Sequence, residues 1–244
     1  MTPAQLDLSA ITPLIVVGLG AVLLPLIEVL LLRTKTFLSR PVSDDWAGTV
    51  MSLVTSAVLL VALLLTFGMA GSSAKVFNLS HPMLLMDGMT NFLSAVILIG
   101  ALLTALSSSK FLADMRINRG EYYTLLLASV LGMMLLVAST DLMLLFVGLE
   151  LMSIPIYAMA GFRRDSLRSN ESALKYFLVG SFASAIMQLG IAFIYGVTGE
   201  ISLDGISKAF HFQADLATDP LAAVGMLLLL VAFAFKVAAA PFHM

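Results

Sequence analysis

The chain has 244 residues, of which 60% are hydrophobic and only 11% are charged, and its formal net charge is −2. Because a soluble domain carries roughly equal shares of apolar and polar residues, this composition excludes an ordinary water-soluble fold and indicates a membrane protein. The absence of cysteine excludes disulfides, thiolate zinc sites and ordinary iron–sulfur ligation on this chain. The charge gives no indication of nucleic-acid binding.

About seven apolar segments are long enough to cross a lipid bilayer, whose hydrocarbon core is spanned by roughly 20 apolar residues. In chain order they are 13–32, 48–69, 90–107, 122–139, 142–162, 172–197 and 221–241. The sequence therefore predicts an all-α polytopic membrane protein with about seven transmembrane helices. The outer loops 70–89 and 198–220 carry polar and turn residues, and we expect a short surface segment in the second.

Lysine and arginine are concentrated in alternate loops. Of the 13 basic residues, nine lie in one set of loops: Arg33, Lys35, Arg40, Lys110, Arg116, Arg119, Arg163, Arg164 and Arg168. The opposite loops hold only Lys75 and Lys208. Since basic loops remain in the cytoplasm, we expect the N-terminus outside and the basic loops inside. The alternation also requires a short turn at residues 140–141.

The other polar residues near the predicted spans are assigned structural roles. Asp87 and Asp141 stand at the starts of spans, where a short acidic side chain suits a helix N-cap. Glu28 is expected at the membrane interface. The three histidines, His81, His211 and His243, are far apart, so no metal site is predicted.

Glu150 lies near mid-membrane, roughly 14 Å from Asp141 and 18 Å from Phe162 at the helical rise of 1.5 Å per residue. An ionisable group at the bilayer centre costs at least ~2.5 kcal/mol on insertion scales. Either a protonated acid donates a hydrogen bond to a neighbouring helix, or the acid carries protons or pairs with a charge. We favour the second interpretation, because Ser or Asn would make a structural link at lower cost.

Lys236 lies about 15 residues into the last predicted span, with no counter-charge nearby in sequence. A lysine there must pair across helices, lose its proton or extend to the interface. Pro241 is expected to break this helix, an interruption typical of transporter ion sites. Pro155, on the fifth span, either bends its helix or frees the carbonyl of Leu151 to hold water or another polar group.

Lys175 follows Glu171 by four residues, the arrangement of a surface pair worth only ~0.2–0.5 kcal/mol. Its position about one turn inside the sixth span favours an interfacial anchor. Glu150 would lie roughly 12 Å deeper than Lys175. Glu150 and one or two lysines thus form a predicted set of coupled titrating groups, in which separation of acid and lysine lets the lysine release its proton.

Three motifs carry a resemblance to a known family. They are GLELMSIPIYAMAGF (148–162), ESALKYFLVGSFASAI (171–186) and KVAAAPFHM (236–244). In this order and spacing they resemble the N-subunit family of the respiratory NADH–quinone oxidoreductase, complex I, an antiporter-like membrane subunit. The related L and M subunits and the Mrp sodium/proton antiporters share the Glu and Lys pattern, and ESALKYF favours N.

The resemblance implies a proton-translocating subunit that couples quinone reduction elsewhere in complex I to proton pumping. The chain would belong to an enzyme, a translocase of the bacterial inner membrane, without a redox centre of its own. NADH, FMN, iron–sulfur clusters and quinone are expected on other subunits, and its partners would be the other membrane subunits and the lipid. The residues implicated are Glu150 and Lys236 as the input pair, Lys175 as a further proton-translocation residue, and Pro155, Pro241 and His243 as support for helix breaks.

The resemblance also implies a division of the chain. A three-helix segment at 1–120 would precede an incomplete first antiporter-like repeat at 121–244, spans 4 to 7, with the last helix interrupted near Lys236–Pro241. This would be the N-terminal half of a fold of about 14 helices, so the chain is expected to be truncated after the seventh span. Two alternatives remain: an Mrp-type cation/proton antiporter subunit and a non-conducting, truncated scaffold subunit.

Overall fold

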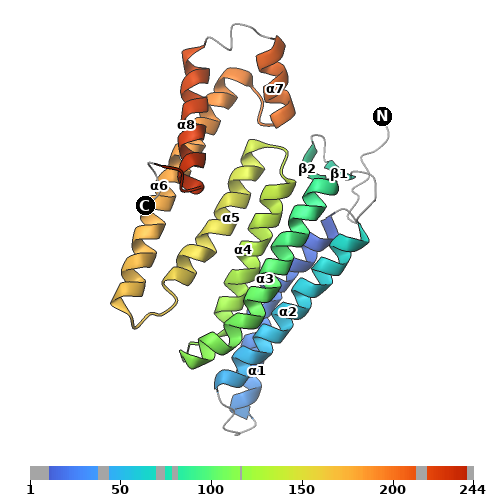
Figure 1. Ribbon diagram of the computed structural model, residues 1–244, viewed down its shortest axis with the longest axis vertical. Coiled ribbons are helices and arrows are strands. Elements are labelled where there is room, and N and C mark those ends of the chain that lie inside the picture. Colours follow the sequence, from blue (N-terminus) through green and yellow to red (C-terminus); the bar gives the residue numbers. More distant parts are fainter. Residues whose placement is uncertain are drawn as a thin grey trace.

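The computed structural model describes residues 11–37, 44–69, 75–78, 82–115, 117–212 and 219–240. Nearly all of this part of the chain is helical (Figure 1). The elements are α1 (Thr12–Phe37), α2 (Asp44–Gly68), β1 (Lys75–Asn78), β2 (Pro82–Met86), α3 (Gly88–Asp114), α4 (Gly120–Ala138), α5 (Leu142–Ala160), α6 (Leu167–Thr198), α7 (Leu203–Phe212) and α8 (Pro220–Lys236). Six helices, α1 to α6, are long and apolar enough to cross a membrane, and α8 is a shorter apolar helix of 17 residues.

The predicted all-α membrane fold is confirmed, and each predicted span falls on one helix. Some helices extend beyond their apolar windows because polar turns continue them, as in α6 with its 32 residues. By contrast, α5 and α8 end before their windows do, at Ala160 and Lys236. The short surface segment expected within 198–220 is α7. The sequence did not predict the antiparallel pairing of β1 with β2, because strands of four and five residues among turn residues have no clear periodicity.

α1 to α4 form one bundle, in which α1 packs against both α2 and α4, and α5, α6 and α8 lie beyond α4 (Figure 1). One buried cluster joins α1 to α4 and includes Val17, Leu59, Leu98 and Leu127, all fully buried. A second buried cluster, which includes Leu149, Met187 and Ala232, lies among α5, α6 and α8. The contact of α4 with α5 therefore connects an N-terminal bundle to a C-terminal group of helices.

α4 and α5 approach each other backbone to backbone. A Cβ added at Gly132 would lie 2.2 Å from the backbone nitrogen of Met152, and one added at Gly148 would lie 2.8 Å from that of Leu136. Small residues at a helix crossing permit such close approach, and in a membrane this packing replaces the hydrophobic driving force. The two glycines therefore determine how close α5 lies to the N-terminal bundle.

Both predicted N-caps are present. The Asp87 carboxylate accepts the backbone N–H of Thr90 at 2.7 Å at the start of α3. Asp141 accepts that of Leu144 at 2.6 Å at the start of α5. Glu28 has a more specific contact than the expected interfacial position, because its Oε1 accepts the backbone N–H of Gly120 at 2.8 Å. It thereby caps the N-terminus of α4 from a different helix.

The ends of the helices separate into two groups (Figure 1). The α3–α4 and α5–α6 connections lie at one end of the bundle, while the hairpin, the α4–α5 turn and α7 lie at the other. At the second end the Leu142 N–H donates to the carbonyl of Ile201, and the Leu203 N–H donates to that of Thr140, each at 3.0 Å. The short turn at 140–141 is confirmed, while the side of the membrane that each end faces stays a prediction.

Candidate functional site

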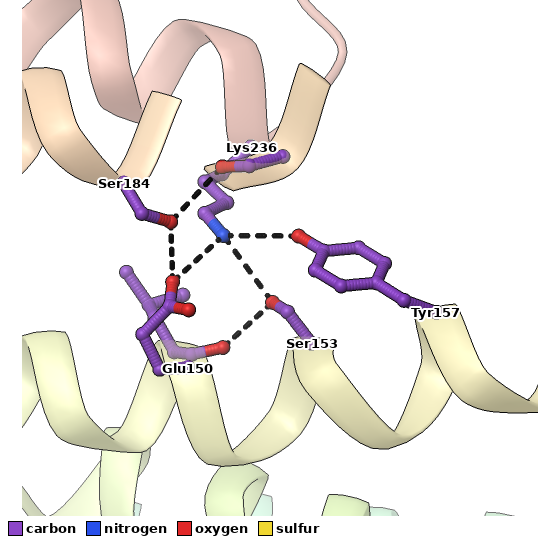
Figure 2. A network of polar contacts seen from close by, with 7 residues as sticks. Glu150, Ser153, Tyr157, Ser184 and Lys236 are labelled. Carbon is purple, nitrogen blue, oxygen red and sulfur yellow. Dashed lines mark hydrogen bonds and ion pairs between the residues drawn. The ribbon is translucent and has the colours of Figure 1, made fainter. Parts of the chain in front are cut away.

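A polar stripe runs along one face of α5. Glu150, Ser153 and Tyr157 occupy positions i, i+3 and i+7, which a helix of 3.6 residues per turn brings to one side. Figure 2 shows these side chains directed toward the end of α8. Ser153 and Tyr157 are buried, and Glu150 is the ninth of the 19 residues of α5, so the stripe begins near the middle of the span.

Lys236 contacts all three members of this stripe. Its Nζ lies 3.4 Å from Oε1 of Glu150, 3.3 Å from Oγ of Ser153 and 3.4 Å from Oη of Tyr157. An ammonium group has three N–H donors and no acceptor, so these oxygens match its hydrogen-bonding capacity. The side chains of Lys236 and Glu150 are only 10% and 21% exposed. The two oppositely charged groups therefore form a largely buried pair.

Lys236 reaches this position because α8 ends there. The helix terminates at Lys236, followed by Val237 as its C-cap, and Ala238 has a φ of +51°. The N–H of Ala239 closes the end by donating to the carbonyl of Ala234 at 2.8 Å, the 6→1 bond of a Schellman cap. A left-handed conformation costs a residue with a Cβ roughly 1–2 kcal/mol, so the helix end carries local strain beside the lysine.

The predicted helix break thus comes earlier than the proline that suggested it. α8 ends at Lys236, five residues before that proline, and the hydrogen bonds of the cap close its last turn. Pro241 and His243 lie outside the described residues. Pro155 is buried within α5, which continues as a helix to Ala160; in the described structure it does not interrupt the helix.

Ser184 of α6 closes the site on the side opposite Tyr157 (Figure 2). Its hydroxyl contacts Oε1 of Glu150 and lies 3.0 Å from the carbonyl oxygen of Gly180. A serine hydroxyl has only one proton to donate. It can therefore donate to an ionised Glu150, or donate to Gly180 while accepting the proton of a neutral Glu150. The same contact serves both protonation states of the acid.

Lys175 is not part of this cluster. Its Nζ lies 2.5 Å from Oε1 of Glu171, and the two side chains are 73% and 65% exposed. The structure therefore brings Glu150 and Lys236 together and leaves Lys175 at the surface, as the spacing of the Glu171 pair predicted. Within the described residues no group of three or more His, Asp or Glu side chains is arranged to hold a metal ion.

Three contributors to the cluster were missed in the sequence: Ser153, Tyr157 and Ser184. A usable signal existed for the first two, because they follow Glu150 at the spacing of one helical face. No such signal existed for Ser184, since its contact with Glu150 depends on the packing of α6 against α5. Local sequence around Ser184 contains no information about that crossing.

The bundle, with a buried acid on one helix facing a lysine at the end of a shortened helix, has the fold of the antiporter-like membrane subunits. Residues 139–244 match the family model described as NADH:quinone oxidoreductase/Mrp antiporter, TM. The chain is 43% identical over 241 residues to NADH-quinone oxidoreductase subunit N 1 of Sorangium cellulosum, covering 96% of this chain and 47% of that relative. The predicted resemblance to subunit N is confirmed.

Solved structures share the fold of this chain. A chain of respiratory complex I from Thermus thermophilus matches with a TM-score of 0.69 and 30% identity, over 95% of this chain and 45% of that one. A chain of the Mrp complex from Dietzia matches with a TM-score of 0.68 over 97% of this chain and 42% of that one, but at 23% identity it supports the fold alone. The chain spans about half the length of the relatives it matches.

Proposed function

We propose that this chain is the N-type proton-translocating membrane subunit of an NADH–quinone oxidoreductase, in which quinone reduction on other subunits drives proton movement through Glu150 and Lys236. The observation that carries the proposal is the largely buried contact, 3.4 Å long, between these two side chains. Similarity to proteins named subunit N over 96% of the chain supports the assignment to this complex. In this proposal the redox cofactors reside on other subunits, and the basic loops face the cytoplasm of a bacterial inner membrane.

The energetics of a buried ion pair suit such a role. Removing each ion from water costs several kcal/mol, and mutual attraction offsets this cost only when the geometry is good. Proximity therefore favours the two charged forms, while separation favours neutral lysine and neutral acid. A change in the distance between α8 and α5, driven by neighbouring subunits, would thus take up or release a proton at mid-membrane.

Lys175 belongs to the proposal through the family resemblance alone. Nine residues of α6 separate it from Ser184, which touches Glu150. That separation corresponds to roughly 14 Å along a helix. A link between Lys175 and the buried pair therefore requires water or further side chains, including those of neighbouring subunits.

The test is proton pumping by a complete NADH–quinone oxidoreductase that contains variants of this chain. Glu150→Gln and Lys236→Ala should each lower NADH-driven acidification of inverted membrane vesicles several-fold, together with coupled quinone reduction. Asp204→Asn and Lys208→Ala are matched controls, because they alter an exposed pair of the same type on α7, and both should pump normally. Native gels establish that each complex is assembled. Normal pumping by assembled Glu150→Gln and Lys236→Ala complexes would refute the proposal.

The same family description also includes Mrp antiporters, which makes an Mrp-type cation/proton antiporter the second candidate. Sodium-dependent proton exchange without NADH would support that function and exclude the first. A non-conducting scaffold would instead assemble normally and tolerate all the charge substitutions. The three functions therefore give different results in the same set of vesicles.

A further inference from the structure

We propose that Tyr157 is a positioning residue of the proton-carrying site, which holds the protonated form of Lys236 through its hydroxyl, and that Gly180 is required for this contact. The inference rests on the proposed function of Glu150 and Lys236. It adds one residue of α5 and one of α6 to the site. Tyr157 lies on α5 and Gly180 on α6. Both are buried in the described structure.

The first argument is the coordination of the ammonium group. The three distances from Lys236 Nζ to its acceptors are nearly equal, 3.3 to 3.4 Å. Charge-assisted N–H···O bonds are usually about 2.7–2.9 Å long, so the carboxylate of Glu150 does not hold the lysine alone. The Ser153 hydroxyl donates its own proton to the carbonyl of Leu149 at 2.6 Å. Ser153 and Tyr157 thus share the ammonium group with Glu150.

The second argument is the fixed orientation of the Tyr157 ring. The ring of Tyr176 packs edge-on against it, with centroids 4.6 Å apart and an interplanar angle of 74°. Phe177 adds a second edge-on contact at 6.2 Å. Such arrangements are favourable for aromatic pairs. Figure 2 shows the Tyr157 hydroxyl directed at the nitrogen of Lys236.

The third argument is the space that Gly180 leaves. A Cβ at this position would lie 2.2 Å from Oη and 2.5 Å from Cζ of Tyr157. Ordinary van der Waals contact begins near 3.4 Å, so an alanine would displace the hydroxyl by about 1.2 Å. The Tyr157 hydroxyl therefore occupies the volume that any side chain at 180 would fill. The carbonyl of the same glycine lies 3.0 Å from the hydroxyl of Ser184, which contacts Glu150.

The groups that surround Lys236 determine the direction in which the pH profile of pumping should move. In the described structure the titratable groups in contact with it are Glu150 and Tyr157 of α5. On α6, the Ser184 hydroxyl contacts the Glu150 carboxylate, whereas Lys175 is paired with Glu171. The Tyr157 hydroxyl can accept from the ammonium form or donate to the neutral amine, but the charge-assisted bond is the stronger of the two, so loss of this oxygen disfavours the ammonium form. We therefore expect the alkaline limb of pumping to move to lower pH.

The experiment compares pH profiles of proton pumping in the complete complex carrying Tyr157→Phe, Gly180→Ala and both together. Each single variant should move the alkaline limb to lower pH by about one unit, equivalent to about 1.4 kcal/mol. The double variant should move it no further, because both changes remove the same contact. Gly196→Ala is the matched control on α6, since nothing lies within 4 Å of a Cβ there, and its profile should equal that of the parent.

Each other outcome overturns a defined part of the inference. If Glu150→Gln and Lys236→Ala lower pumping while the Tyr157→Phe profile equals that of the parent, the role of Tyr157 is refuted and the proposed function stands. Additive shifts in the double variant would refute the link between Gly180 and Tyr157. A shift in Gly196→Ala would show that the effect is not local and refute both roles. If Glu150→Gln and Lys236→Ala also pump normally, the proposed function fails and the inference fails with it.

Discussion

The backbone contact between α4 and α5 gives a quantitative prediction for Gly132→Ala. The new Cβ would lie 2.2 Å from the Met152 nitrogen, 2.6 Å from the Leu151 carbonyl carbon and 2.8 Å from the Gly148 oxygen. These are all backbone atoms, so no side chain can rotate away. The helices must separate by about 1.2 Å to restore ordinary contact, which begins near 3.4 Å.

The expected cost follows from two opposing terms. Overpacking of a well-packed site costs typically about 1–3 kcal/mol, whereas replacing glycine by alanine within a helix gains about 1 kcal/mol. The net result should be a loss of up to roughly 2 kcal/mol in the free energy of unfolding. Because α5 carries Glu150, Ser153 and Tyr157, the same displacement should also weaken their contacts with Lys236.

The assay is equilibrium unfolding of the chain in mixed detergent micelles, followed by far-ultraviolet circular dichroism. Gly100→Ala and Gly196→Ala are controls within α3 and α6, because a Cβ at either position meets nothing within 4 Å. Both should raise the free energy of unfolding by up to about 1 kcal/mol, because only the helix-propensity gain applies there. If Gly132→Ala is as stable as these controls, α4 and α5 do not approach at their backbones and the reasoning is wrong.

Three further predictions concern local features. Ala238→Gly should raise the free energy of unfolding by roughly 1 kcal/mol, measured in the same micelles, because glycine adopts the positive φ of the α8 cap without a Cβ clash; equal stability would contradict a left-handed cap. The hydrogen bond from Thr90 lowers the pKa of Asp87, so its contribution to stability should be complete above the ordinary carboxyl pKa and be lost as the pH falls through the lowered value. Unfolding measured between pH 2 and 6 should therefore show a pH-dependent component that Asp87→Asn abolishes, and an unchanged profile would exclude this cap as its source. Lys175→Ala should leave the free energy of unfolding unchanged within error, since its exposed pair with Glu171 is screened by water; a clear loss of stability would show that the pair is not a surface one.

Much of the fold follows from the sequence because lipid imposes a strong constraint. Every backbone N–H and C=O in the bilayer must be paired within the segment, so an apolar run of sufficient length becomes a helix. That rule placed each span on one helix, and the alternation of basic loops predicted the 140–141 turn. Likewise, the cost of a charge in lipid identified Glu150 and Lys236 as exceptional without any knowledge of packing.

The features that escaped prediction depend on contacts between distant segments. The interruption near Lys236–Pro241 was predicted, but the Schellman cap at Ala238 that closes α8 at Lys236 was not, because no glycine marks it in the sequence. Each strand of the β1–β2 hairpin is defined only by its pairing with the other, because neither is long enough to show a periodicity in the sequence.

Composition and periodicity by themselves determined the membrane class, the helices and the two charged residues that lipid makes costly. Only the tertiary structure decided that these two residues meet, that Lys175 stays outside their cluster, and that Ser153, Tyr157 and Ser184 complete it. The physical reason is that the cost of burying one charge is a property of its own segment. The partner that offsets this cost is selected by the crossing of α5 with α6 and by the point at which α8 ends.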